Sequence, residues 1–170
     1  MQTITSAGTS INSTRAPAVY NIRRARDLMA GRLVLDYGAG KYDSGISAGR
    51  RIGATVVPYD PYNRTPAENE YALSQYYDVA ICSNVLNVIN CPDARRDAIT
   101  EMANHATILL FTVYEGDRSG KGRKTSAGWQ ENRPTDSYVE EIQKTLGKRY
   151  RVRREGKLIT ALLNPSMFAY

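Results

Sequence analysis

The chain has 170 residues, a length typical of one domain built around a single core. Its 42% apolar and 24% charged residues are close to globular averages, which excludes disorder, collagen and a disulfide scaffold. No apolar run reaches the roughly 18 residues needed to span a bilayer, so we expect no membrane segment. With 23 Lys and Arg against 17 Asp and Glu, the net charge of +6 favours a polyanionic partner.

The two cysteines and the polar N-terminal residues indicate the cellular compartment and the boundaries of the domain. Cys82 and Cys91 have neither metal-ligand spacing nor partners for a framework of disulfides, so we expect a reducing cytoplasm and no zinc. Residues 1–15 lack the apolar core of a signal peptide and are predicted to form a flexible tail. Residues 16–170 are predicted to form one domain.

Along the chain, apolar spacing alternates between helical and strand-like periods, as is typical of alternating β and α elements. Buried strands are predicted at 33–35, 55–58, 78–83 and 106–114. An early helix would have one apolar face, made of Ala18, Ile22, Ala25 and Met29. A helix before the fourth strand would have a buried face made of Ala94, Ala98, Ile99 and Met102. Its outer side would carry most of the charged residues Arg95, Arg96 and Asp97.

The last part of the chain predicts a helix and a hairpin. The helix would start with Thr135 as its N-cap, after Pro134, and end at Gly147. Segments 148–154 and 158–163 flank Glu155-Gly156 and predict an antiparallel hairpin. The whole pattern predicts an α/β, Rossmann-like fold: an open, mostly parallel twisted sheet with helices on both faces and a C-terminal antiparallel hairpin.

The strongest chemical signal is the segment 34–40, a buried strand that ends in Asp36 and a turn with Gly38 and Gly40. Ligands of open α/β sheets bind at such carboxyl ends, and glycines let the backbone approach them closely. Asp60 ends the next strand, where its carboxylate can accept hydrogen bonds from both hydroxyls of a ribose. A nicotinamide dinucleotide is disfavoured because Asp43 replaces the third glycine of its fingerprint. The competing interpretation is a sharp turn without a ligand.

Three segments resemble motifs of the class I S-adenosylmethionine-dependent methyltransferases: 35–40 the first, 59–61 the second and 78–89 the fourth. The stretch 84–89 and Gly128-Trp-Gln130 look most like small methyltransferase-like proteins associated with DNA phosphorothioation and their phage-type relatives. The resemblance extends over 33–147.

This resemblance implies S-adenosylmethionine as cofactor. The glycines would lie under its methionine part, Asp36 would help to hold its amino group and Asp60 its ribose. Ser83 and Asn84 would border the methyl group as catalytic residues that orient the acceptor. The full set of cofactor-binding residues would be Asp36, Tyr37, Gly38, Ala39, Gly40, Asp60, Pro61, Ser83 and Asn84. The acceptor would be bound by Trp129, Gln130, Lys121 and Arg123.

Several residues depart from the family pattern. Tyr42 stands at the position of the third glycine, and the short stretch between Asp60 and Asp78 predicts that one sheet strand is missing or shortened. The candidates for an adenine contact are therefore reduced to Glu68, Asn69 and Glu70. Cys82 lacks the preceding proline of cytosine C5 enzymes, and the chain also lacks the Pro-Pro-aromatic motif of the exocyclic-amine enzymes.

Two basic regions suggest the acceptor. Segment 116–124 is rich in glycine and predicts a mobile loop near the cofactor, and alternation places Arg149, Arg151 and Arg153 on one strand face. We therefore expect methyl transfer to nucleic acid, by a monomer or homodimer that recruits a protein partner for target recognition. Two alternatives remain: an inactive adaptor or anti-defence protein that binds the cofactor or nucleic acid, and a small-molecule methyltransferase with a merely solvated basic face. Trp129 could equally anchor the last helix to the core.

Overall fold

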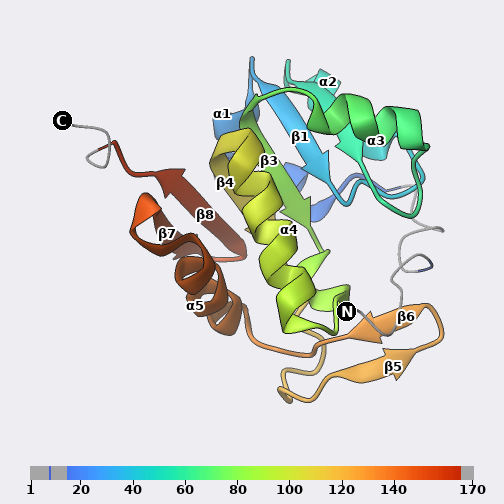
Figure 1. Cartoon of the computed structure of the whole chain (residues 1–170), viewed down its shortest axis with the longest axis vertical. Helices are drawn as coiled ribbons and strands as arrows, with labels where there is room; N and C mark the ends of the chain where they lie inside the picture. The colour runs from blue at the N-terminus through green and yellow to red at the C-terminus, as the bar shows by residue number, and fades with distance from the viewer. Residues whose placement is uncertain (1–7, 9–14, 166–170) are drawn as a thin grey trace.

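The computed structural model describes residues 8 and 15–165, and its core is a six-stranded sheet with the order β2-β1-β3-β4-β8-β7 (Figure 1). Strands β1 to β4 are parallel, whereas β8 and β7 are antiparallel to their neighbours. The predicted mostly parallel sheet with a C-terminal antiparallel hairpin is therefore confirmed. The strand bounds are β1 Leu33–Tyr37, β2 Thr55–Tyr59, β3 Tyr77–Ser83, β4 Ala106–Thr112, β7 Tyr150–Glu155 and β8 Leu158–Leu163.

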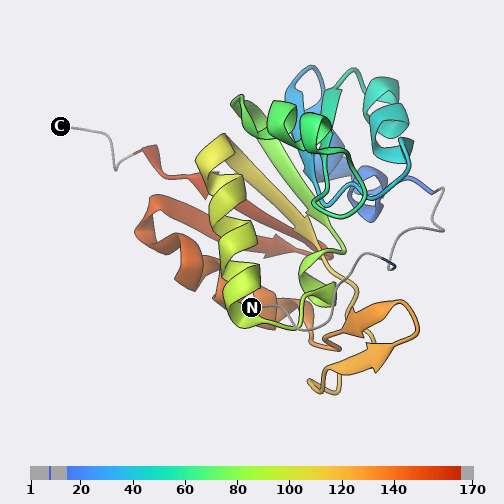
Figure 2. The same cartoon turned by 45° about the vertical axis from the view of Figure 1, so that its right-hand side comes forward.

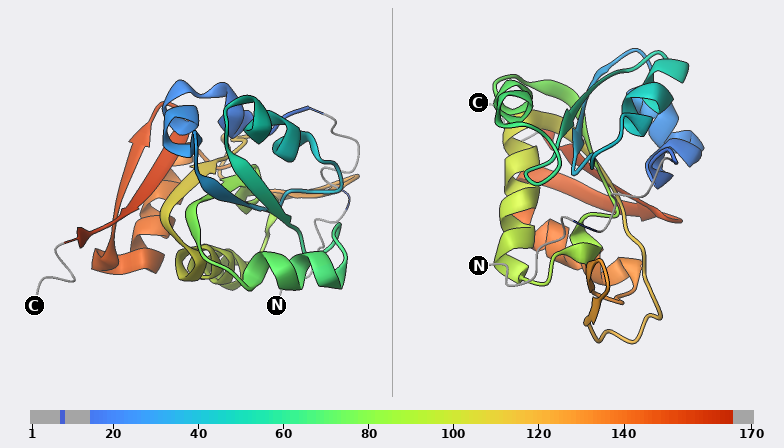
Figure 3. Two further views of the ribbon diagram at one scale, coloured as in Figure 1. Left: turned by 90° about the horizontal axis from the view of Figure 1, so that it is seen from above. Right: turned by 90° about the vertical axis from the view of Figure 1, so that its right-hand side faces the viewer.

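Helices cover both faces of the sheet, as Figure 3 shows. One face carries α3 (Pro66–Leu73), α4 (Pro92–His105) and α5 (Thr135–Leu146), and the other carries η1 (Ala18–Asn21), α1 (Arg23–Met29) and α2 (Ser44–Arg51). Two short 3₁₀ turns, η2 (Leu86–Val88) and η3 (Gly147–Arg149), complete the helical elements. Adjacent residues of β1 serve the two cores, because Val34 packs with Met29 while Leu35 packs with Ile99. This two-sided burial explains the continuous apolar strands of the sequence.

The first helix differs from its prediction. Ile22 takes an extended conformation, with φ −100° and ψ 118°, and thereby separates η1 from α1. Val19 and Tyr20 are buried, whereas Ala18 is exposed. The predicted single face is therefore wrong at its start, because the chain changes direction at Ile22.

Only α3 connects β2 to β3, and β2 is an edge strand of the described sheet. The expected loss of one strand in this segment is confirmed. Pro58 fits an edge position, since proline cannot donate a ladder hydrogen bond.

Two further predictions about the second half of the chain need correction. Segment 116–124 is not simply a mobile loop, because Arg123–Thr125 (β5) pairs with Gly128–Gln130 (β6) in a hairpin that projects beyond the carboxyl ends of the parallel strands (Figure 2). Pro134, not Thr135, is the N-cap of α5. Thr135 is the first helical residue, and both its N–H and its hydroxyl donate to Glu115 Oε1, at 2.7 and 2.8 Å.

Candidate functional site

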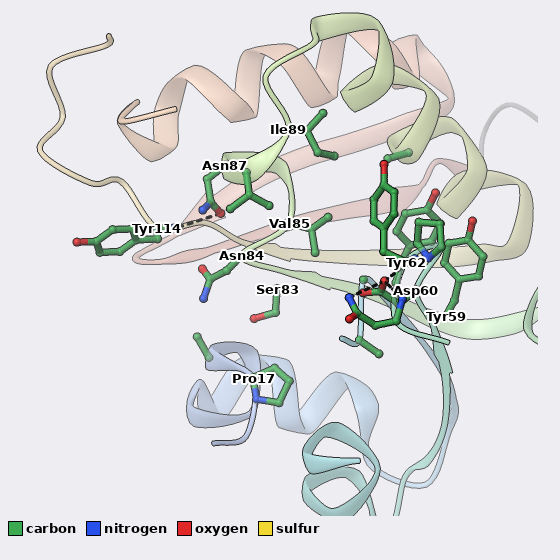
Figure 4. Close-up of a pocket in the computed structure, with 18 of the residues that line it drawn as sticks. Pro17, Tyr59, Asp60, Tyr62, Ser83, Asn84, Val85, Asn87, Ile89 and Tyr114 are labelled. Carbon is green, nitrogen blue, oxygen red and sulfur yellow. Dashed lines mark hydrogen bonds between the residues drawn. The ribbon is translucent and has the colours of Figure 1, made fainter. Parts of the chain in front are cut away.

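A cavity of about 810 Å³ lies at the carboxyl ends of β1, β2 and β3 (Figure 4). Its walls also include residues of α4, of the β5–β6 hairpin and of the segment 15–18. The volume falls in the upper part of the range of small-molecule sites. Of the predicted site residues, those that line the cavity are Tyr37, Gly38, Ala39, Asp60, Pro61, Ser83, Asn84, Trp129 and Gln130.

The glycine turn after β1 is fixed by its backbone. Gly38 and Gly40 have φ values of 84° and 70°, which side chains rarely allow. The N–H groups of Gly38 and Ala39 both donate to Tyr59 O, at 2.8 and 3.0 Å. A Cβ on Gly38 would lie 2.3 Å from Val85 Cγ2. Glycine is therefore required here both by the backbone conformation and by the side chain packed above it.

Arg64 braces this glycine loop from the other side. Its Nε donates to Gly40 O at 2.9 Å and its Nη2 donates to Tyr42 O at 3.1 Å. Its Nη1 pairs with Asp43 at 2.7 Å, and the Arg64 side chain is only 8% exposed. No sequence motif surrounds Arg64, so the sequence does not predict it as a site residue.

Asp60 has a structural role beside any ligand contact. Its Oδ2 accepts the Gly40 N–H at 2.9 Å. Its Oδ1 accepts the N–H groups of Tyr62 and Asn63, at 2.9 and 3.0 Å. A carboxylate oxygen has about two lone-pair sites, so Oδ2 can still accept one ligand hydroxyl while it holds the loop.

Asp36 and Gly40 do not line the cavity but lie behind its wall. Asp36 is 2% exposed, and a Cβ on Gly45 of α2 would be 2.3 Å from its Oδ2. Burial raises the pKa of Asp36 to about 7, and the positive charge of Arg64 opposes that rise. The carboxyl predicted to hold the amino group is thus a buried group that ionises near neutral pH.

Aromatic and acidic side chains gather at the end of the cavity formed by β2 and α4. Four tyrosines line it: Tyr37, Tyr42, Tyr59 and Tyr62. The Tyr37 and Tyr59 ring centroids are 4.7 Å apart. Two carboxylates outside the predicted set of site residues, Asp97 and Glu101 of α4, also line the cavity. Their i, i+4 spacing beside Ala94 and Ala98 was the available signal.

None of the three candidates for an adenine contact lines the cavity. Glu68 forms a capping box with Thr65 at the start of α3. The Asn69 amide bonds to the backbone N–H and C=O of Asp60, both at 3.0 Å. The side chains of Glu68 and Asn69 are therefore occupied in shaping the connection from β2 to α3.

The opposite end of the cavity is formed by the residues that follow β3 and β4. Ser83 Oγ is 2.8 Å from Thr112 Oγ1, and Asn84 N–H donates to Thr112 O at 2.8 Å. Asn84 has a φ of 59°, a left-handed conformation that is uncommon outside glycine. Its amide points into the cavity near Ser83 and Asn87 (Figure 4). Strained residues of this kind persist where the surrounding structure holds them, often at functional sites.

The predicted acceptor-binding residues of the hairpin divide into two pairs. Trp129 and Gln130 line the cavity, whereas Lys121 and Arg123 are exposed and do not. The Gln130 amide is bonded at both ends, to Asn87 Nδ2 at 3.2 Å and to Tyr114 O at 3.0 Å. Gln130 therefore ties the hairpin to the end of β4, rather than presenting a free amide.

Arg95 is buried, 3% exposed, so its predicted place on the outer side of α4 is wrong. Its Nη1 pairs with Glu131 at 2.8 Å and its Nε pairs with Glu141 at 2.7 Å. Its Nη1 also donates to Ile89 O at 2.6 Å. Glu131 Oε1 in turn accepts the Trp129 indole N–H at 3.1 Å. These carboxylates make the inward position of the charge favourable, and they link α4, α5 and the hairpin.

The fold is that of class I S-adenosylmethionine-dependent methyltransferases, as solved structures indicate. The chain is similar to a Burkholderia thailandensis 1,6-didemethyltoxoflavin-N1-methyltransferase with bound S-adenosylhomocysteine: TM-score 0.62, 16% identity, 87% of this chain and 79% of the other covered. It is also similar to the glycopeptide N-methyltransferase MtfA complexed with S-adenosylhomocysteine: TM-score 0.57, 13% identity, coverage 88% and 91%. A third similar structure is the N-terminal domain of EvdMO1, with TM-score 0.54, 12% identity and coverage 89% and 85%.

Sequence comparisons add nothing to this structural likeness. No model of a protein family matches the chain, and no protein of curated function matches it. The narrower likeness to phage-type and DNA phosphorothioation proteins gains no support from these comparisons.

None of the helices in the described part of the chain is long and apolar enough to cross a bilayer. Within residues 8 and 15–165, no cluster of three or more His, Cys, Asp or Glu side chains is suited to hold a metal ion.

Proposed function

We propose that the protein is an S-adenosylmethionine-dependent methyltransferase. The observation that carries this proposal is the placement of the glycine loop, Asp60 and Ser83-Asn84 around one cavity, at the strand ends where open α/β sheets bind ligands. The fold shared with structures that hold S-adenosylhomocysteine supports the choice of cofactor.

The residues of the cavity fit this cofactor. Asp60 Oδ2 retains a site for a ribose hydroxyl, and the tyrosines of β1 and β2 offer apolar ring faces for a planar base. The carboxylates Asp97 and Glu101 add negative charge to the cavity wall, which favours a cationic ligand. When bound, the cofactor supplies an electrophilic methyl group on a sulfonium.

The chain's own part in catalysis is then orientation. Methyl transfer is an in-line displacement, so the rate depends mainly on holding the acceptor in line with the methyl group. Ser83 is held by Thr112, and Asn84 is fixed by its backbone hydrogen bond to the same residue. These two residues would set the direction from which an acceptor approaches.

We further propose nucleic acid as the acceptor. Exposed basic residues gather in and just before the β5–β6 hairpin, namely Arg118, Lys121, Arg123 and Lys124, and Lys124 is the register partner of the cavity residue Trp129. The net charge of +6 has the same sign. Basic groups of this kind bind phosphates and place a nucleic acid without reading its sequence.

Transfer of labelled methyl groups tests both proposals. The protein is incubated with methyl-labelled S-adenosylmethionine and, in separate arms, single-stranded DNA, RNA, cellular protein and a small-molecule extract. We expect label in nucleic acid, with transfer that falls steeply as salt rises. Label confined to the small-molecule arm would show that the acceptor is a small molecule and not nucleic acid. Cofactor binding without transfer in any arm would instead favour an adaptor.

A further inference from the structure

The end of the cavity formed after β3 and β4 differs chemically from the end near Asp60. Its side chains are Ser83, Asn84, Asn87, Tyr114 and Trp129, which carry hydroxyl, amide, phenol and indole groups. Neither an imidazole nor a carboxylate is among these five side chains. The carboxylates that line the cavity come instead from the end of β2 and from α4. An acceptor at this end must therefore attack with a lone pair that it already has.

Asn84 provides a hydrogen-bonding edge. In the described part of the chain its side-chain amide has no hydrogen-bond partner, although its backbone is held in a left-handed conformation. Figure 4 shows this amide facing the cavity between Ser83 and Asn87. An amide presents a donor and an acceptor side by side, which matches the edge of a heterocycle that carries both.

Two aromatic rings provide flat surfaces. Tyr114 lines the cavity and is 62% exposed, so its ring is open to a ligand. Trp129 lines the same cavity, and its indole N–H is fixed by Glu131 at 3.1 Å. Its ring also rests against Gly122, where a Cβ would lie 2.2 Å from ring atom Cζ2. The buried Arg95 holds Glu131, so the ring is preorganised before a ligand arrives.

We propose that this end of the cavity is an acceptor subsite for a planar nitrogen heterocycle, methylated on a pyridine-type ring nitrogen. The inference rests on the proposed methyltransferase function. The ring nitrogen's lone pair forms the new N–CH₃ bond while the S–CH₃ bond breaks, and its electrons remain on sulfur as a neutral thioether. The positive charge passes to the heterocycle, so no proton has to be removed. The faces of Tyr114 and Trp129 favour that cation through cation–π attraction.

A nucleobase has this chemistry, whether it is free or part of a strand. The test therefore uses the four nucleosides and, separately, four single-stranded homopolymers, each with methyl-labelled S-adenosylmethionine. We expect label on one base and at least a tenfold loss when its ring nitrogen is replaced by carbon in the deaza analogue. Label in the homopolymer alone identifies nucleic acid as the source, and label in the nucleoside identifies a free heterocycle. Equal transfer to the deaza analogue would overturn the inference.

Variants separate the subsite from the cofactor site. Trp129→Ala should raise the acceptor KM at least tenfold, Trp129→Phe should restore most of the affinity, and Asn84→Gly should raise KM without straining the backbone. Both Trp129 variants should leave the Kd for S-adenosylhomocysteine within about twofold, and so should the exposed control Lys144→Ala, which should also keep the wild-type KM. Unchanged acceptor KM values in Trp129→Ala and Asn84→Gly would contradict the subsite.

Glu131 is a positioning residue in this scheme, and the single tryptophan of the chain reports on it. Glu131→Gln should shift the Trp129 emission and raise the acceptor KM more than it lowers kcat. An unchanged emission and KM would overturn the positioning role. If the wild-type protein binds neither S-adenosylmethionine nor S-adenosylhomocysteine, the proposed function itself fails, and the subsite inference falls with it.

Discussion

Two buried arginines brace the two sides of the cavity, and they do so differently. Arg64 holds the glycine loop mainly through backbone carbonyls, and its ion-pair partner Asp43 has a side chain that is 66% exposed. Arg95 pairs with Glu131, which directly follows the β5–β6 hairpin, and with Glu141 of α5, and these side chains are only 12% and 19% exposed.

The difference lies in what each arginine leaves behind when it is removed. Without Arg64, carbonyl groups lose a donor, but the exposed carboxylate of Asp43 can be solvated by water. Without Arg95, the largely buried Glu131 loses its counter-charge, whereas Glu141 keeps its ion pair with Arg133. A buried carboxylate left without a counter-charge is the costlier case. We therefore expect the hairpin to depend on its arginine for stability, whereas the glycine loop depends on Arg64 mainly for its shape.

The largest expected effect is that of Arg95→Leu. Breaking a buried ion pair from one side typically costs about 3–5 kcal/mol of folding free energy. The matched control is Arg96→Leu on the same helix, whose exposed pair with Asp93 should contribute less than about 1 kcal/mol. Urea unfolding of the two variants measures the contrast, and similar losses in both would remove the distinction between the arginines.

On the side of the cavity that carries the glycine loop, protein stability should depend on pH through Asp36. Its pKa is raised to about 7, so the folded state keeps a proton that the unfolded chain releases near pH 4. This contribution to stability is complete below about pH 4 and is lost as the pH rises toward 7. Over this range the free energy of unfolding of Asp36→Asn should therefore rise relative to that of the wild type, by more than about 1.4 kcal/mol, the equivalent of one pKa unit. Urea unfolding at pH 4.5, 6 and 7.5 tests this, and parallel curves would refute the buried-carboxyl account.

Arg64→Leu should cost about 2 kcal/mol, because it removes charge-assisted hydrogen bonds to Gly40 O and Tyr42 O without burying a lone carboxylate. It should also weaken S-adenosylhomocysteine binding, since the loop would lose its shape. Arg50→Leu, an exposed change on α2, is the control. Unaltered ligand affinity in Arg64→Leu would show that the loop does not need this brace.

The smallest effect concerns the base of the hairpin. Glu115→Gln weakens the contacts to Thr135 that satisfy the start of α5, and caps of this kind are worth about 1 kcal/mol. Those contacts lower the pKa of Glu115 to about 2, so its stabilising effect is present above about pH 4.5 and is lost as the pH falls toward 2. Thermal unfolding at neutral pH, with the exposed Glu140→Gln as control, measures the loss. Equal melting temperatures for the two variants would exclude the cap.

The same contrast explains how far the sequence could predict the structure. The glycine turn after β1 and the polar residues after β3 are local patterns, because a buried strand directly precedes each. Burial of Arg95 was not predictable from its helix, since its partners stand 36 and 46 residues away. The glycines Gly116, Gly120 and Gly122 predict a loop and mask the two short strands of the hairpin.

The site was predicted in outline only. Its strand ends follow from the parallel sheet, and most of the selected residues do line one cavity. Arg64, Asp97 and Glu101 were missed because their roles depend on how α3 and α4 meet the sheet after one strand is lost. For the same reason the candidates for an adenine contact do not reach the cavity, since Asn69 is hydrogen-bonded to the backbone of Asp60.

The central claim, that this cavity binds S-adenosylmethionine, is tested most directly by calorimetric titration of the purified protein with S-adenosylmethionine and S-adenosylhomocysteine. We predict one site with micromolar affinity for both ligands. Asp60→Asn should weaken it at least tenfold, because a charge-assisted bond to the ribose is lost. Asp93→Asn, which removes an exposed carboxylate outside the cavity, should leave the affinity unchanged. Absence of binding by the wild type, or equal affinity in Asp60→Asn, would contradict the claim.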